Sequence, residues 1–319
     1  MPTASLRRSL TVLALAALSS VSVFAQVGAP VARLLQQPAF HGFQQAGAQL
    51  SGPGGVRVQL TPRGRFLEQA TLTVPSADPA LVARYLNVLL DGDYTAALTD
   101  FLGRPSVKAA LPAGFTTQAD AYDLRLQSSG AGLQVRVSLH QQSGFAPVPV
   151  ARTLGSAAAP IVVRLYSDFQ CPFCQKAELE ALPAVLRQLG PDVRFEFHHL
   201  PLERLHPNAR SAAEASVCAE QQGKFWPFKD ALFRRNDWQR ADSPVAAYRA
   251  VAAQVGLNLD QYQRCVASRA GRAEVDAGLA EADRLEVSGT PTVFVNGYTV
   301  PDPYDAASYQ QLIEFVRAR

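Results

Sequence analysis

Two cysteines separated by two residues, Cys171 and Cys174, have the types and spacing most able to do chemistry in this chain. They follow an apolar run at 161–166 and open a helix-favouring segment at 175–186, which predicts a strand, a turn and a helix. At a helix N-terminus the unpaired N–H groups and the helix dipole favour a thiolate. The pair therefore predicts a dithiol–disulfide centre that moves electron pairs between sulfurs.

The same spacing is also half of a zinc site, which would need two further ligands. The other two cysteines, Cys218 and Cys265, are widely separated, and His198 and His199 adjoin the end of a predicted strand. These spacings make zinc the less favoured interpretation. No metal and no other cofactor is predicted.

A second motif, at 288–297, places Pro291 directly before a β-rich run and a turn. A proline can begin a strand where its missing N–H is not needed. A trans proline at a strand start and a cis Thr290–Pro291 bond are both compatible with this position.

The elements that must position these motifs alternate between strand and helix. Strands are predicted at 161–167, 193–199 and 292–295, and helices at 172–189, 208–285 (a long helical block) and 306–317. Strands separated by helices predict an α/β sheet covered by helices. The block at 208–285 is too long for one crossover, so it predicts an inserted helical subdomain.

Residues 26–150 are predicted to form a separate, small α+β N-terminal domain. Its predicted elements are strands at 56–60 and 70–74 around a turn at 62–64, a helix at 79–90 capped by Ser76 or Asp78, and a hairpin of 122–126 and 133–139. It contains no cysteine and no phosphate loop, so its role stays open. A Pro/Ala/Gly/Ser-rich linker at 146–160 leads into the second domain, 151–319.

The N-terminus, residues 1–25, is predicted to be a cleaved signal peptide. Arg7 and Arg8 precede an apolar core at 10–18 and a cleavage site at 23–25. The alternative is an uncleaved anchor, but the core is short for a membrane span. Without this segment the formal charge falls from +3 to about +1, which gives no electrostatic footprint for nucleic acid. Export to the periplasm or cell envelope is predicted.

All four cysteines lie in the C-terminal half of the chain. An even number in an exported chain favours pairing. Cys171 and Cys174 are natural partners, which leaves Cys218 and Cys265 for each other. The sequence leaves the connectivity open, and this pairing is the simplest.

Four motifs in order resemble the DsbA-like branch of the thioredoxin superfamily. They are SDFQCPFC (167–174), LHPNA (205–209), CAEQQGKFW (218–226) and SGTPTVFVNG (288–297). The resemblance covers about residues 152–319. It implies a thioredoxin-like α/β fold with an inserted helical subdomain, here preceded by the small α+β domain. Members of this branch often hold the insertion with a structural disulfide, which Cys218 and Cys265 would supply.

The resemblance also implies the roles of the residues at the redox centre. Cys171 is expected to be the exposed nucleophile and Cys174 the resolving thiol. Pro291 is expected to be cis and to face the disulfide, with Thr290 tuning the reduction potential and substrate contact. No prosthetic group is implied.

Two positions depart from the family pattern. Leu165 stands six residues before the nucleophile, where thioredoxin-like proteins commonly carry a buried acid. The proton step at Cys174 must then use water or another group, and Glu196 is a candidate. Phe173 replaces the histidine of DsbA-type oxidants, so we expect the pKa of Cys171 to lie below that of free cysteine without reaching the oxidant extreme.

Other residues near the motifs have ordinary interpretations. We interpret Lys176 as solvated, and His206 as a cap-region residue rather than a proton shuttle. Asp168 either orients the backbone or has a plain turn role. Phe225 and Trp226 are expected to pack in the core.

The sequence therefore predicts an exported thiol–disulfide oxidoreductase that introduces disulfides into envelope or secreted proteins. Its substrates would be unfolded or cysteine-containing exported proteins, and a membrane quinone-linked thiol oxidase would reoxidise it by analogy. A disulfide reductase or isomerase is the nearest alternative. A peptide- or partner-binding module with residual redox activity is another, to which Leu165 lends some support.

Overall fold

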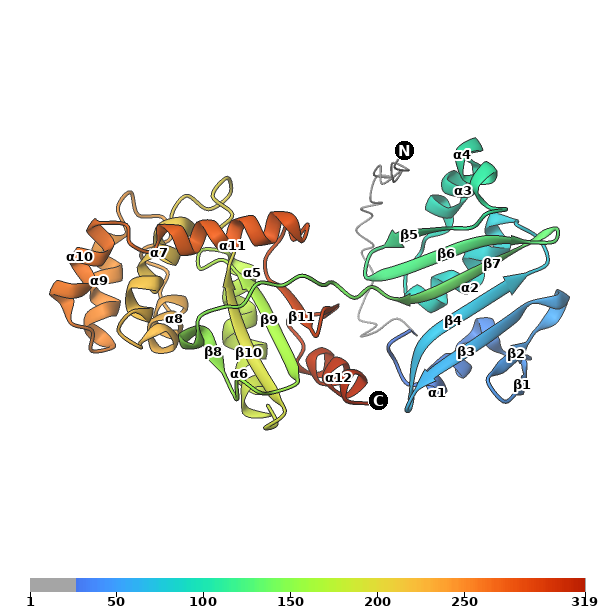
Figure 1. Cartoon of the computed structure of the whole chain (residues 1–319), viewed down its shortest axis with the longest axis horizontal. Coiled ribbons are helices and arrows are strands. Elements are labelled where there is room, and N and C mark those ends of the chain that lie inside the picture. Colours follow the sequence, from blue (N-terminus) through green and yellow to red (C-terminus); the bar gives the residue numbers. More distant parts are fainter. Residues whose placement is uncertain (1–26, 319) are drawn as a thin grey trace, which may run out of the picture. The chain divides into compact units, whose positions relative to one another are not determined.

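The computed structural model describes residues 27–318, which form two compact units (Figure 1). The N-terminal unit runs up to His140 and takes in the residues from Glu314, and the dithiol unit is Gln141–Ile313. The predicted signal peptide, residues 1–25, lies outside the described residues. In the part of the chain described, none of the helices is both long and apolar enough to cross a membrane.

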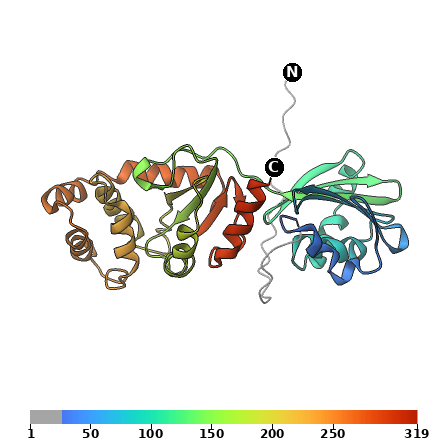
Figure 2. The same cartoon turned by 90° about the horizontal axis from the view of Figure 1, so that it is seen from below.

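The N-terminal unit has an antiparallel sheet of seven strands in the order β1-β2-β3-β4-β7-β6-β5. The strands are β1 (Gln44–Ala46), β2 (Gln49–Ser51), β3 (Arg57–Arg63), β4 (Phe66–Val74), β5 (Phe115–Ala119), β6 (Tyr122–Ser129) and β7 (Gly132–Leu139). The helices, gathered on one face of the sheet in Figure 2, are α1 (Val31–Leu35), α2 (Pro79–Leu90), α3 (Thr95–Gly103) and α4 (Pro105–Ala110). The buried apolar side chains of the two layers form one core.

Local sequence signals explain most of the predicted elements of this unit. Helix α2 has the predicted bounds, and the Asp78 carboxylate caps it by accepting hydrogen bonds from the N–H groups of Ala80 and Leu81. The predicted turn at 62–64 is wrong at its start, because Pro62 lies within β3. The register shifts between Thr61 and Pro62, and such an irregularity accommodates a residue without an N–H group.

The dithiol unit has a five-stranded sheet in the order β12-β11-β9-β10-β8. Its strands are β8 (Thr153–Leu154), β9 (Ile161–Ser167), β10 (Val193–His199), β11 (Thr292–Val295) and β12 (Tyr298–Thr299). Strands β9 and β10 are parallel, and the other pairs are antiparallel. The three predicted strands are confirmed with their bounds, whereas β8 lies in the stretch predicted to be linker.

The helix predicted at 172–189 is interrupted. It consists of α5 (Pro172–Lys176), a π-helical turn (Ala177–Ala181) and α6 (Leu182–Arg187). Pro183 is the physical reason, because it has no N–H group to continue the α-helical hydrogen bonds. The last helix, α12 (Ala306–Arg317), has the predicted bounds.

The predicted helical insertion is confirmed as a group of separate helices. These are α7 (Ala209–Glu220), α8 (Phe225–Phe233), α9 (Val245–Gln254), α10 (Leu259–Ala267) and α11 (Arg272–Arg284). Helices α7–α10 gather at one end of the dithiol unit, and α11 returns to pack on β10 (Figure 1). The α/β fold with an inserted helical subdomain, preceded by a small α+β unit, is therefore the observed architecture.

Candidate active site

Both cysteines of the dithiol lie where β9 leads into α5. Cys171 is the N-terminal cap residue of α5, and Cys174 lies one turn further along. Cys174 is fully buried, and Cys171 is only 3 % exposed. The expectation that Cys171 is exposed is therefore wrong, since its Sγ lies against the Thr290 segment, while the adjacent Phe173 is 60 % exposed.

The segment that faces the dithiol is the one predicted at 288–297. The Thr290–Pro291 peptide bond is cis, and the Sγ of Cys171 lies 3.6 Å from the carbonyl oxygen of Thr290. Strand β11, which follows Pro291, pairs with β9, which precedes the dithiol. The sheet thereby brings together two motifs that are far apart along the chain.

The two thiols of the site have opposite pKa shifts. The hydrogen bond from the Cys174 side chain is the first cause that lowers the pKa of Cys171 to about 6, and N–H groups of Cys174 and Phe173 add to it against the effect of burial. Burial is the main cause that raises the pKa of Cys174 well above its ordinary value. At neutral pH, Cys171 is therefore the thiolate and Cys174 the thiol, which matches the direction expected for Cys171.

In the structure, the position where thioredoxin-like proteins commonly carry a buried acid has an apolar environment. Leu165 is buried within β9, paired with Phe197 of β10 and Val293 of β11. The carboxylate of Glu196 instead accepts a hydrogen bond from the Nε of Arg194 (2.8 Å) and forms an ion pair with Arg164, whose Nε lies 2.9 Å from Oε2. These contacts give no support to Glu196 as the group that handles the proton of Cys174.

A buried ion pair beside the active-site helix was missed from the sequence. Glu178 follows Cys174 by four residues, one helical turn, and its Oε2 lies 2.5 Å from the Nζ of Lys229 on α8. Both side chains are almost completely buried, and burial raises the pKa of Glu178 while the charge of Lys229 opposes this. The i, i+4 spacing from Cys174 was the available signal. Phe225, on the same helix as Lys229, is buried as expected.

Three other residues that the sequence analysis singled out lie around the dithiol. The Lys176 ammonium lies 5.0 Å from the ring centroid of Tyr304, so it is not simply solvated. Asp168 and His206 bond each other, with 2.7 Å between Oδ2 and Nδ1. The cap-region interpretation of His206 is therefore incomplete.

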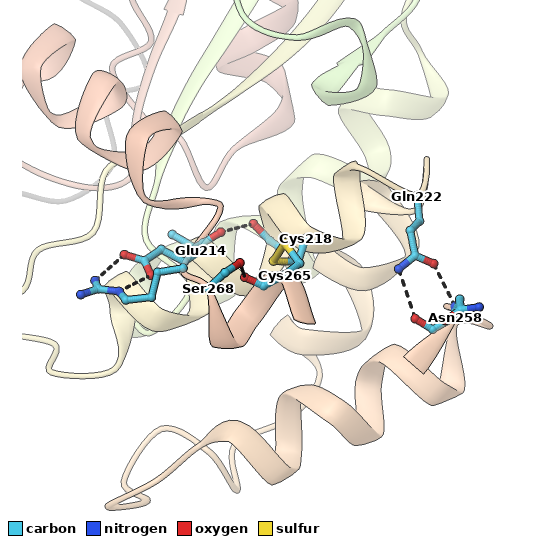
Figure 3. The surroundings of a disulfide bond; sticks show 9 residues. Glu214, Cys218, Gln222, Asn258, Cys265 and Ser268 are labelled. Atoms are coloured by element: carbon cyan, nitrogen blue, oxygen red, sulfur yellow. Dashed lines mark hydrogen bonds and ion pairs between the residues drawn. A yellow bond between two sulfur atoms is a disulfide. The ribbon is translucent and has the colours of Figure 1, made fainter. Parts of the chain in front are cut away.

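The other two cysteines form a disulfide between α7 and α10 (Figure 3). Cys218 and Cys265 are 47 residues apart, and both are buried. The hydroxyl of Ser268 donates to the carbonyl oxygen of Cys265, and nearby Gln222 and Asn258 exchange two hydrogen bonds that also join the two helices. The disulfide thus lies within the helical insertion, outside the redox centre.

Removing this disulfide is expected to destabilise the protein without changing the dithiol. The double variant Cys218→Ala/Cys265→Ala should have a free energy of unfolding about 2–4 kcal/mol lower, because the unfolded chain regains the entropy of a long loop. Urea unfolding checks this, with both proteins in the Cys171→Ser/Cys174→Ser background so that only one disulfide differs. Equal urea midpoints and slopes for the two proteins would contradict the expectation.

A zinc centre receives no support from the geometry. Within residues 27–318, the His, Cys, Asp and Glu side chains form no group of three or more that could hold a metal ion. Cys218 and Cys265 are joined to each other, so neither is available as a ligand beside the dithiol.

Comparison with known proteins identifies the dithiol unit. The family model described as "Thioredoxin" matches residues 148–315. The Na(+)/H(+) antiporter NhaA 3 of Salinispora tropica is 40 % identical over 170 residues, 52 % of this chain and 25 % of the antiporter. The antiporter NhaA of Herminiimonas arsenicoxydans is 31 % identical over 163 residues, 51 % of this chain and 25 % of that protein. The chain thus spans about a quarter of the length of these curated relatives.

Two solved structures match a similar share of the chain. Oxidised BdbD from Bacillus subtilis is 20 % identical with a TM-score of 0.48, covering 55 % of this chain and 94 % of BdbD. A thioredoxin-like oxidoreductase from Silicibacter pomeroyi DSS-3 is 26 % identical with a TM-score of 0.46, covering 52 % of this chain and 92 % of that one.

The family match spans more than half of the chain and contains every feature of the redox centre. It includes the dithiol at the start of α5, the cis Thr290–Pro291 bond and the helical insertion between β10 and β11. The chain belongs to the thioredoxin family.

Proposed function

We propose that this chain is an exported enzyme that introduces disulfides into envelope or secreted proteins. The observation that carries the proposal is the geometry of the dithiol, with Cys171 at the N-terminal cap of α5 and its Sγ facing the carbonyl oxygen of Thr290 in the cis Thr290–Pro291 segment. The lowered pKa of Cys171 and the raised pKa of Cys174 agree with this arrangement. A cysteine that is stable as a thiolate is a good leaving group, so the Cys171–Cys174 disulfide is readily reduced by a substrate. An enzyme that is readily reduced oxidises its substrate.

The proposed reaction has two exchange steps. A substrate thiolate attacks the Sγ of Cys171 in the oxidised enzyme, so the bond to Cys174 breaks and its electron pair stays on Cys174. The second substrate thiolate then attacks the substrate sulfur of this mixed disulfide and releases Cys171 as a thiolate. The substrate has lost two electrons and two protons, and the enzyme dithiol has gained the electrons.

The proposed setting follows from the sequence. A cleaved signal peptide at 1–25 would deliver the chain to the periplasm or cell envelope, where unfolded or cysteine-containing exported proteins are its substrates. Reoxidation of the dithiol would fall to a membrane quinone-linked thiol oxidase, by analogy with the DsbA-like branch. Ion antiport is not proposed, because the antiporters match this chain over only its thioredoxin part.

The reduction potential of the Cys171–Cys174 pair tests the direction of electron flow. Full-length protein is equilibrated in glutathione buffers, and thiol alkylation with mass spectrometry gives the oxidised fraction. A potential between about −120 and −180 mV is expected, the range from DsbA to protein disulfide isomerase. A potential below about −180 mV, toward the −270 mV of thioredoxin, would contradict the proposed direction.

A reductase is the second candidate, and one observation favours it. Phe173 gives the thiolate only its backbone N–H, whereas a histidine there would add charge. The same measurement of the potential decides between the two directions.

A further inference from the structure

The side chain of Asp168 is a buried hydrogen-bond centre next to the dithiol. It is 0 % exposed and accepts from three donors. Its Oδ1 accepts from the N–H of Gln170 (2.7 Å), and its Oδ2 accepts from the N–H of Leu202 (2.9 Å) and lies 2.7 Å from the Nδ1 of His206. A carboxylate has only acceptors, so Nδ1 carries the hydrogen of this last bond.

These donors come from two loops at one end of the sheet. Asp168 follows β9, and both Leu202 and His206 follow β10, which is parallel to β9. The carboxyl ends of neighbouring parallel strands are where α/β folds gather functional groups. The Asp168–His206 contact therefore fixes the loop before the dithiol to the loop before the helical insertion.

The backbone of Asp168 contacts both cysteines. Its N–H donates to the Sγ of Cys174 at 3.4 Å, and its carbonyl oxygen accepts from the N–H of Cys171 at 3.2 Å. Any rotation of the Asp168 peptide group would move the donor away from Cys174. Asp168 thus links His206, which its side chain contacts, to both cysteines, which its backbone contacts. The side chain of His206 is 17 % exposed, whereas that of Asp168 is buried.

We propose that His206 is a positioning residue for thiol–disulfide exchange: by holding the Asp168 carboxylate, it keeps the Asp168 N–H directed at the sulfur of Cys174. This inference rests on the proposed function, because it concerns the first exchange step. When a thiolate attacks Cys171, the disulfide bond breaks, a new bond forms at Cys171, and the electron pair remains on Cys174. The Asp168 N–H then stabilises the charge that develops on Cys174, which afterwards takes a proton from water.

A donor at this place is needed because of what surrounds Cys174. Burial disfavours its thiolate and raises its pKa, and Leu165 occupies the position of the family acid. A leaving thiolate of lower pKa leaves faster, so one fixed N–H donor speeds the breaking of the bond. Cys174 is uncharged in the starting disulfide and in the final thiol, and it carries negative charge only in the transition state and in the thiolate that forms from it. The donor therefore affects rates more than the equilibrium.

The experiment compares two substitutions of the same histidine. His206→Leu removes the hydrogen bond to Asp168, whereas His206→Asn keeps an N–H donor attached to Cγ, where Nδ1 is attached. The rate at which reduced glutathione attacks the oxidised full-length protein is measured, together with the reverse rate and the reduction potential. His41→Leu, an exposed histidine of the N-terminal unit, is the matched control.

His206→Leu should slow both directions of exchange by roughly three- to tenfold, the range expected from losing one net hydrogen bond. The reduction potential should stay unchanged, and His206→Asn and His41→Leu should react at nearly the wild-type rate. Equal rates for His206→Leu and wild type, or equal slowing in His206→Leu and His206→Asn, would overturn the inference. A changed reduction potential in His206→Leu would also overturn it, since that indicates a general structural effect on the dithiol.

Asp168→Asn keeps the inference testable if His206→Leu does not fold. This variant has nearly the same shape but replaces one acceptor oxygen by a donor, so it should slow exchange to a similar extent; a wild-type rate would overturn the inference. A wild-type protein that does not react with glutathione at all would instead refute the proposed function. Failure of the inference about His206 and failure of the proposed function therefore give different results.

Discussion

Replacing Cys171 by serine is expected to reduce catalysed thiol–disulfide exchange to the uncatalysed rate. The pKa of about 6 makes Cys171 the thiolate at neutral pH, and its sulfur lies 3.6 Å from the carbonyl oxygen of Thr290. A serine hydroxyl is not ionised at this pH and cannot form a mixed disulfide. The measurement is the oxidation of a reduced two-cysteine peptide, followed by mass spectrometry.

The matched control is Cys174→Ser, which keeps the nucleophile but removes the resolving thiol. Mixed with the disulfide form of the peptide, it should accumulate a mixed disulfide, because the Cys171 thiolate attacks the peptide disulfide, one peptide sulfur leaves as a thiolate, and no internal thiol is left to release the other. A Cys171→Ser variant that retains peptide oxidation would exclude Cys171 as the nucleophile. If peptide binding survives the substitution and wild type shows no exchange, the protein acts as a binding module.

Elements with a clear hydrophobic pattern could be predicted from the sequence. Strands β9, β10 and β11 are short apolar or β-rich runs bounded by loop residues, and the structure gives them the predicted bounds. The two-residue strands β8 and β12 were not predicted, since they are too short to show a period and exist only through pairing with β10 and β11. Whether such short segments form strands depends on their pairing with other strands, which the local sequence does not show.

The candidate site likewise contains residues that a local motif predicts and contacts that no local motif predicts. Cys171, Cys174 and Pro291 were found because each belongs to a short motif with a chemical meaning. The contacts Glu178–Lys229 and Asp168–His206 join residues 51 and 38 positions apart, and neither pair has a local signature. The burial of Cys171 was likewise missed, because the approach of Thr290, 119 residues further along the chain, has no local signature.

The stability of the reduced protein relative to the oxidised one is expected to depend on pH. In the folded, reduced protein the pKa of Cys171 is about 6, against an ordinary value of 9.0. A lowered folded-state pKa gives stability that is fully present above the ordinary value and is lost as the pH falls through about 6. The oxidised protein has no thiolate, so this contribution is absent from it.

The difference in unfolding free energy, reduced minus oxidised, should therefore rise between about pH 6 and pH 9. Above about pH 9 the trend should reverse, because the raised pKa of Cys174 favours its thiol in the folded state and that contribution is lost as the pH rises. Urea unfolding of both forms across this range measures the difference. The variant Cys174→Ala lacks the side-chain hydrogen bond that is the first cause of the lowered pKa of Cys171. When its reduced form is compared with oxidised wild type, the difference in unfolding free energy should therefore rise less with pH. A difference that does not change with pH would show that Cys171 is not a stabilised thiolate.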